Sequence, residues 1–233
     1  MNRQKIWQKI WSRKYDSHSS IADLHVAAGY DMLTSKQWQK LTHFFISKLG
    51  LKSTDKVLEV GCGCGAFLNQ LNGIVESMSG IDYSESAINH LDRILTGSFK
   101  VAEANQIPFS NDSFDVVLSF GVFFYFQDFD YATKTLEEMR RVLQPGGTIF
   151  VGEVSDIDKL EIANRLRTKE SNERDNRKVS TDNPDHLYYD RAFFKSYAQK
   201  HDLQCVIIDE DVEDLEFYPN SRYRFSVILQ DER

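Results

Sequence analysis

The chain has 233 residues, a formal net charge of −7 at pH 7 and an isoelectric point near 5.4. Hydrophobic residues make up 41% and aromatic residues 12% of it, a composition typical of a globular protein that can bury a substantial core. No stripe of lysine and arginine follows the N-terminal dozen or so residues. Because nucleic-acid affinity comes largely from neutralising phosphates, we expect no nucleic-acid partner and favour a small molecule.

The number of cysteines and the length of the apolar runs bear on where in the cell the protein is expected. Cys62, Cys64 and Cys205 are too few and too scattered for a disulfide framework, and no second Cys/His pair at ligand spacing accompanies Cys62-x-Cys64. The N-terminus lacks an apolar signal core, and no apolar run is long enough to span a bilayer. We therefore expect a cytoplasmic protein with no metal and no membrane partner, either a monomer or a homodimer.

Residues 1–50 have helical periodicity. Ile6, Trp7, Ile10 and Trp11 recur at helical spacing, and a second pattern runs from Ser35 to a stop at Gly50. A basic amphipathic start can mark a helix on a membrane surface. We favour a helical cap over a ligand, because the sequence continues directly into the core.

From Lys56 onward, strand patterns alternate with helix patterns. Strands are expected at 57–60, 77–82, 99–102, 114–119 and 148–151, and helices at 66–71, 84–95 and 131–143. A polar insertion at about 155–185 interrupts the alternation, and a helix at 191–200 and strands at 203–208 and 223–229 follow it. Strands spaced by helices indicate an α/β fold with a doubly wound, mostly parallel sheet.

The first strand leads into a glycine-rich turn. Gly61, Gly63 and Gly65 lack Cβ atoms, so the backbone can take unusual conformations and a nucleotide-like ligand can lie against it. Gly61-x-Gly63-x-x-Ala66, with Asp82 about 20 residues further on, also satisfies the loose dinucleotide fingerprint. Glu59 argues against a pyrophosphate, which prefers amide donors and no anion nearby. A ligand with a cationic amine and a sulfonium suits this carboxylate better.

Four ordered blocks support a family resemblance: Glu59-x-Gly-x-Gly-x-Gly, Asp82 after the second strand, Glu103-Ala104 before Ile107-Pro108-Phe109, and the aromatic block 120–126. Together they resemble the class I, Rossmann-like S-adenosylmethionine-dependent methyltransferase family, small-molecule type. The resemblance implies a seven-stranded sheet with an antiparallel C-terminal hairpin in a domain at 51–233. It also implies an N-terminal cap at 1–50 and a substrate lid at about 155–185.

The resemblance also implies the cofactor, S-adenosylmethionine, and the residues that contact it. Asp82 would accept hydrogen bonds from the ribose, with Tyr83 beside the adenine. Glu103 would receive the adenine amino group, with the Ala104 amide facing the ring. The remaining cofactor contacts are assigned to the glycine turn, the end of the fourth strand and lid tyrosines: Glu59, Gly61, Gly63, Gly65, Ser119, Phe120, Tyr15 and Tyr30.

For the chemistry we expect metal-free, in-line methyl transfer to a small molecule, most plausibly at oxygen. A hydroxyl acceptor usually needs a base, and His186 is the best candidate because its ordinary pKa lies near 6.5. Tyr125 is a second catalytic candidate, and Glu153 and Asp156 are weaker ones. The open alternatives are nitrogen or carbon methylation, a protein or nucleic-acid acceptor, and a nonenzymatic subunit that binds the cofactor.

Overall fold

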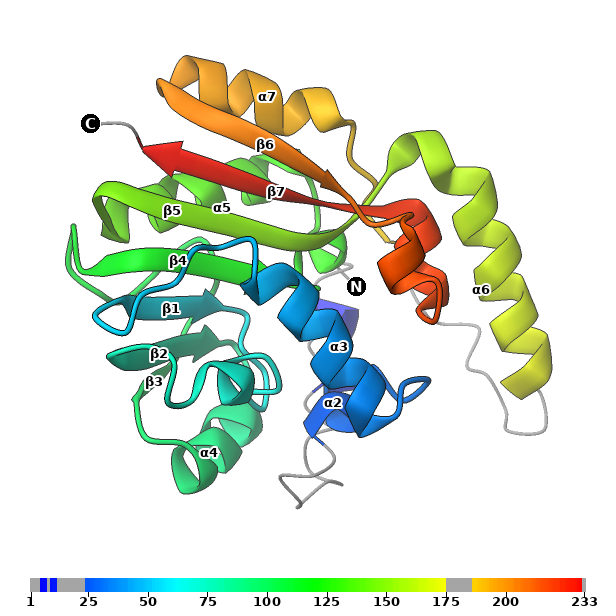
Figure 1. Ribbon diagram of the computed structural model, residues 1–233, viewed down its shortest axis with the longest axis horizontal. Helices are drawn as coiled ribbons and strands as arrows, with labels where there is room; N and C mark the ends of the chain where they lie inside the picture. Colours follow the sequence, from blue (N-terminus) through cyan, green and yellow to red (C-terminus); the bar gives the residue numbers. More distant parts are fainter. Residues whose placement is uncertain (1–4, 8, 12–23, 175–185, 232–233) are drawn as a thin grey trace.

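A seven-stranded sheet organises the computed structural model, which describes residues 5–7, 9–11, 24–174 and 186–231, without the side chains of 168–174 (Figure 1). The strand order is β3-β2-β1-β4-β5-β7-β6. Strands β1 to β5 are parallel, and β7 is antiparallel to both β5 and β6. The fold class expected from the sequence is therefore confirmed. The strands are β1 (Lys56–Val60), β2 (Ser77–Asp82), β3 (Ser98–Val101), β4 (Phe114–Phe120), β5 (Leu143–Ser155), β6 (Leu203–Asp209) and β7 (Arg224–Asp231).

Helices cover both faces of the sheet. Successive strand residues point to opposite faces, so Val57 joins one hydrophobic core and Leu58 the other. In Figure 1, α3 crosses in front of the sheet and α5 lies behind it. One core includes side chains of α3 and α4, and the other includes side chains of α5 and α7. The helices are α2 (Leu24–Ala27), α3 (Ser35–Ile46), α4 (Glu85–Ile94), α5 (Phe129–Val142), α6 (Leu160–Arg174) and α7 (Arg191–Lys200).

Local sequence explains where several helices begin. Ser84 accepts a hydrogen bond from the Ala87 amide and caps α4, as expected, and Asp128 caps α5 in the same way. The α-helix expected at 66–71 is wrong, because only a 3-10 helix at Leu68–Leu71 forms there. Six residues containing Asn69 and Gln70 are too few for a stable α-helix, so packing against the sheet decides the conformation.

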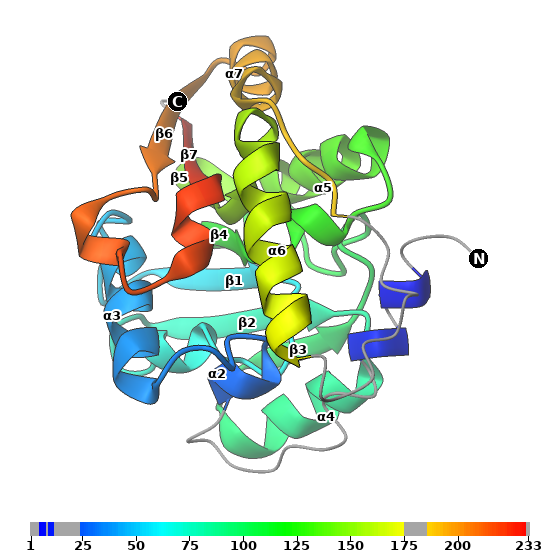
Figure 2. The ribbon, with the colours of Figure 1, turned by 90° about the vertical axis from the view of Figure 1, so that its right-hand side faces the viewer.

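Helix α6 occupies the polar insertion. Figure 2 shows it standing along one end of the sheet, and it contacts the 3-10 segment Pro219–Tyr223 that precedes β7. Residues 175–185 of the expected lid lie outside the described residues, so the lid stays a prediction. The expected boundary between cap and domain also stays a prediction, although α3 shares one hydrophobic core with the sheet. None of the helices described is long and apolar enough to cross a membrane.

Candidate active site

A pocket lies at the carboxyl ends of β1, β2 and β4, the edge where open α/β sheets bind ligands. Each of these strands ends in a turn that brings backbone or a carboxylate to the pocket. The carboxylates are those of Glu59 and Asp82, joined by Glu103 after β3. Ten of the residues singled out from the sequence line this pocket: Tyr30, Glu59, Gly61, Gly63, Asp82, Tyr83, Glu103, Ala104, Phe120 and Tyr125.

The glycine turn needs glycine at two positions. Gly61 has a φ of +79°, and a Cβ added there would lie 2.7 Å from the Val122 Cγ2 atom. Gly65 has a φ of +81°, and its Cβ would lie 2.3 Å from the Leu91 Cδ1 atom in α4. Gly61 and Gly63 therefore bring bare backbone to the pocket. Gly65, which does not line the pocket, allows α4 to pack closely against the turn.

Asp82 sits at the end of β2 with both carboxylate oxygens engaged. One oxygen accepts the Gly63 amide at 3.0 Å and the other accepts the Ser84 amide at 2.8 Å. Burial raises the pKa of Asp82 to about 6, although these two amides lower it. Each carboxylate oxygen keeps a further lone pair, so the group can also accept hydroxyl donors from a ligand.

Glu59 is 3% exposed, and its Oε2 atom has no hydrogen-bond partner among the residues described. Burial raises the pKa of this carboxyl well above its ordinary value, while the Leu68 amide lowers it. A buried carboxylate oxygen without a partner is costly, and a cationic ligand group beside it would favour the charged form of Glu59.

At the other side of the pocket, Tyr83, Glu103 and Ala104 lie together with Tyr131, a residue that the sequence analysis missed. The Tyr131 hydroxyl donates to the Glu103 Oε2 atom at 2.8 Å and so fixes the orientation of that carboxylate. Burial raises the pKa of the Tyr83 phenol, which stays protonated at neutral pH. This side offers a flat ring surface and an oriented acceptor, the combination that an adenine needs.

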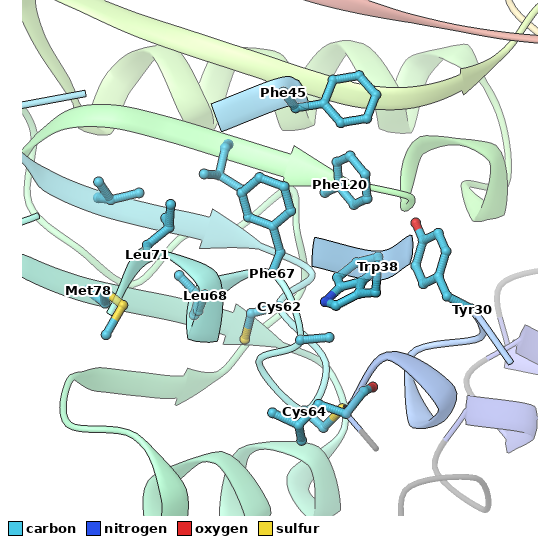
Figure 3. Packing of buried hydrophobic residues seen from close by; sticks show 14 of the residues in the cluster. Tyr30, Trp38, Phe45, Cys62, Cys64, Phe67, Leu68, Leu71, Met78 and Phe120 are labelled. Carbon is cyan, nitrogen blue, oxygen red and sulfur yellow. Dashed lines mark hydrogen bonds between the residues drawn. The ribbon is translucent and has the colours of Figure 1, made fainter. Parts of the chain in front are cut away.

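Aromatic side chains close the pocket between its two ends. Figure 3 shows Trp38 between Tyr30 and Phe67, with Phe120 beside them. The ring centroids of Tyr30 and Trp38 are 4.6 Å apart, and those of Phe67 and Phe120 are 4.8 Å apart. Burial raises the pKa of Tyr30 well above its ordinary value, so it is a neutral hydrogen-bond donor in the pocket wall.

Besides Gly65, one more of the expected cofactor residues that the structure describes does not line the pocket. Ser119 is fully buried, and its hydroxyl donates to the Val60 carbonyl at 2.9 Å, so it ties β4 to β1 without lining the pocket. Its position one residue before Phe120 points it to the opposite face of the strand. Tyr15 lies outside the described residues.

The outer end of the pocket is a wall of Trp7, Trp11 and Tyr125. The Tyr125 ring centroid lies 4.6 Å from that of Trp7 and 5.6 Å from that of Trp11. Burial raises the pKa of the Tyr125 phenol, although the Arg224 charge lowers it. At neutral pH Tyr125 is therefore neutral, so its phenol is a potential hydrogen-bond donor and not a base.

The base candidates lie behind this wall. The His186 ring is 5.5 Å from Tyr125 and 5.6 Å from Trp7, but it does not itself line the pocket. Glu153 is fully buried and accepts from Tyr218 and Arg224, while Asp156 is 1% exposed and accepts from Arg191. None of the three lines the pocket, and His186 is the best placed because its ring packs against Trp7 and Tyr125, which do line it.

Comparison with known proteins agrees with this geometry. Residues 58–151 match the family described as "Methyltransferase domain". Over these residues the chain is similar to the methyltransferase family, and its fold is that of class I S-adenosylmethionine-dependent methyltransferases. The match supports the predicted family, enzyme class and cofactor for this part of the chain.

Relatives of this methyltransferase domain differ in their acceptors. Over 160 residues the chain is 29% identical to a demethylmenaquinone methyltransferase of Staphylococcus aureus, covering 65% of this chain and 59% of the relative. Over 119 residues it is 29% identical to the probable tRNA methyltransferase 9B of Mus musculus, covering 51% of this chain and 25% of the relative. The chain thus spans only part of these curated relatives.

A solved structure extends the likeness in fold. The phosphoethanolamine N-methyltransferase 1 of Haemonchus contortus, in complex with phosphoethanolamine and S-adenosylhomocysteine, superposes with a TM-score of 0.73 at 14% identity. The match covers 98% of this chain and 48% of that one. At this level of sequence identity, the likeness shows only that the two chains share a fold.

Several residues that line the pocket were not predicted from the sequence. Trp7 and Trp11 were expected in a cap, and their helical spacing was the available signal for an inward face. Trp38 and Tyr131 belong to helical patterns whose buried face could equally have been core. The pocket also takes Phe67 from the turn after the glycines.

Proposed function

We propose that the protein transfers the methyl group of S-adenosylmethionine to a hydroxyl oxygen of a small molecule, in the cytoplasm and without a metal ion. The observation that supports this most is the division of one pocket into an acid-lined inner part and an aromatic outer end. The inner part complements a cationic cofactor. The outer end complements an acceptor small enough to enter between Trp7, Trp11 and Tyr125.

The inner part suggests how the cofactor would be held. Asp82 would accept the ribose hydroxyls, and Tyr83, Glu103 and Ala104 would contact the adenine. The methionine ammonium would face Glu59, whose Oε2 atom lacks a partner among the described side chains. The methionine chain would then run along Gly61 and Gly63, and the sulfonium would lie near Tyr30 and Phe120.

The outer end suggests how the chain would assist the reaction. S-Adenosylmethionine, when bound, supplies a methyl group that is electrophilic because it is attached to a sulfonium. The aromatic wall would exclude water and align the acceptor oxygen with that methyl group, and alignment accounts for much of the rate of such a displacement. Tyr125 would donate a hydrogen bond to the acceptor, and His186 would receive the acceptor's proton, directly or through one water.

A nucleic-acid acceptor is the second candidate, because the chain also resembles a probable tRNA methyltransferase. The pocket walls disfavour it, since the described residues that line them include three carboxylates and no lysine or arginine. Nitrogen or carbon methylation and a nonenzymatic role as a cofactor-binding subunit are further outcomes that an assay would reveal.

The test is to incubate the purified protein with methyl-labelled S-adenosylmethionine and a cell extract, and to analyse small-molecule and macromolecular fractions by mass spectrometry. We expect label on an oxygen of a small molecule, and none with the Asp82→Asn variant. Label confined to protein or nucleic acid would overturn the small-molecule proposal. Label on nitrogen or carbon would correct the methylated atom, and binding of S-adenosylhomocysteine without any transfer would support the nonenzymatic role.

A further inference from the structure

A buried ion pair lies behind the aromatic wall of the pocket, between β5 and β7. Glu153 is fully buried and Arg224 is 5% exposed. The Arg224 Nη1 atom donates to the Glu153 Oε2 atom and, at 2.8 Å, to the Tyr218 hydroxyl. That hydroxyl donates in turn to the Glu153 Oε2 atom at 2.5 Å. The three side chains therefore form a closed hydrogen-bonded triangle.

The backbone is distorted where this pair forms. Val151 of β5 pairs with Val227 of β7, and the next pair is Val154 with Phe225, so two residues of β5 oppose one of β7. Within this bulge Glu153 has a φ of +65°, a left-handed conformation that costs energy in a non-glycine residue. Bulges redirect side chains, and this one places the Glu153 carboxylate against Arg224.

Arg224 connects the pair to the pocket. Its guanidinium lies over the Phe124 ring, 4.7 Å from the ring centroid. The Phe124 ring centroid is 4.3 Å from that of Tyr125, which belongs to the outer wall and lines the pocket. The Phe124 carbonyl accepts the Leu187 amide at 2.8 Å, which also fixes the His186 segment to this turn.

We propose that Glu153 and Arg224 are positioning residues. They fix Phe124 and, through it, the Tyr125 ring of the outer wall, and thereby set where the acceptor lies. A buried ion pair adds little net stability over a well-packed apolar pair, so its retention at a strained bulge needs another reason. Orientation of the wall supplies that reason, because the guanidinium holds Phe124 from behind while Glu153 and Tyr218 hold the guanidinium. The inference rests on the proposed function, since it concerns the acceptor end of that site.

The test uses a probe at the wall itself and needs no acceptor. Tyr125 of the full chain is replaced by 3-fluorotyrosine, and the fluorine resonance is recorded by NMR at neutral pH. In Arg224→Met we expect the resonance to shift and broaden, because the guanidinium that packs over the Phe124 ring beside Tyr125 is lost.

Two variants separate positioning from general stability. Arg224→Lys keeps a cation at this position and should restore part of the parent resonance position. Arg191 is a matched control, because it also pairs with acids, Asp156 and Asp209, and lies 5.2 Å from the Phe225 ring centroid without lining the pocket. Arg191→Met should leave the resonance unchanged.

S-Adenosylhomocysteine titration completes the test, because its affinity should stay within about twofold in Arg224→Met if only the outer wall moves. An unchanged fluorine signal in Arg224→Met, or a signal that changes only together with loss of S-adenosylhomocysteine binding, would overturn the positioning role. If Arg224→Met does not fold, Glu153→Gln keeps the arginine and replaces the carboxylate with an amide of the same shape, and the same outcomes apply. A fluorine shift in a protein that methylates nothing would refute the proposed function and the placing of an acceptor, and would leave standing only the effect of Arg224 on the Tyr125 ring.

Discussion

The two ends of the pocket are built differently. At the cofactor end, Glu59, Asp82 and Glu103 each lie at or just after the end of a parallel strand, and the sheet alone brings them together. At the acceptor end, Trp7, Tyr125 and His186 come from distant parts of the chain and meet through ring packing. In the proposed function the sheet would therefore set the position of the cofactor, whereas packing of rings from distant segments would set that of the acceptor.

The largest effect should come from the cofactor end. Asp82→Asn should weaken binding of S-adenosylhomocysteine by roughly 100-fold, because charge-assisted hydrogen bonds to the ribose are lost. Isothermal titration calorimetry measures this directly. Asp115→Asn is the matched control, since Asp115 also accepts a backbone amide, that of Lys56, but at the opposite end of the strands. Equal affinities for the two variants would contradict the assignment of Asp82.

The acceptor end should respond in turnover more than in cofactor affinity. Trp11→Ala removes one ring from the outer wall and should lower methyl transfer by roughly tenfold, which corresponds to the loss of one or two aromatic contacts. Transfer from labelled S-adenosylmethionine and affinity for S-adenosylhomocysteine are measured on the same preparation. Trp11→Phe should recover most of the activity. If Trp11→Ala lowered the affinity for S-adenosylhomocysteine as much as the rate of methyl transfer, the two ends of the pocket would not have separate roles.

Proton binding should also separate the two ends. The Asp82 pKa is raised to about 6, and the ribose hydroxyls bind the ionised form best. Affinity for S-adenosylhomocysteine should therefore be constant above that value and fall by up to about tenfold per pH unit below it. Titrations between pH 5 and pH 8 measure this, and Asp82→Asn should remove the decrease that begins near pH 6. A parent profile without any decrease on the acid side would show that Asp82 does not titrate in the site.

The smallest effect is expected at Ser119. Its hydroxyl donates to the Val60 carbonyl and not to the pocket, so Ser119→Ala should change S-adenosylhomocysteine affinity by no more than about twofold. The free energy of unfolding should fall by about 1 kcal/mol, the usual value of one buried hydrogen bond. Urea unfolding with calorimetry on the same variant tests both parts. A large loss of affinity would restore Ser119 to the cofactor site.

The fold was predictable because each of its signals is local. Apolar runs bounded by glycine or polar turns predicted the strands, and Ser84 marked the start of α4. The helix expected at 66–71 failed because tertiary packing determines so short a segment, which became the 3-10 helix Leu68–Leu71. Strand β5 extends to Ser155, beyond its expected end, because pairing with β7 continues past the bulge at Glu153.

In the candidate site, only the residues that lie at the ends of strands could be predicted from the sequence. Glu59 and Asp82 stand at fixed distances from the glycine turn, so the motif placed them. Tyr131 lies 28 residues from the Glu103 carboxylate that it holds, and Arg224 lies 71 residues from Glu153. Such pairs have no spacing rule, because the sheet order and the bulge bring them together. For the same reason the sequence suggested Glu153 as a possible base, because its pairing with Arg224 could not be predicted from spacing.

The place of Trp7 in the pocket wall has a practical consequence for anyone handling the protein. Trp7 and Trp11 contribute two of the pocket's rings, so an affinity tag or fusion added before them would be joined within a few residues of side chains that line the pocket. Kinetic constants measured on such material would depend on the length and charge of the added sequence. The C-terminal strand β7 ends at Asp231, and β7 contributes no residue to that wall, which makes the C-terminus the better attachment point for assays and immobilisation.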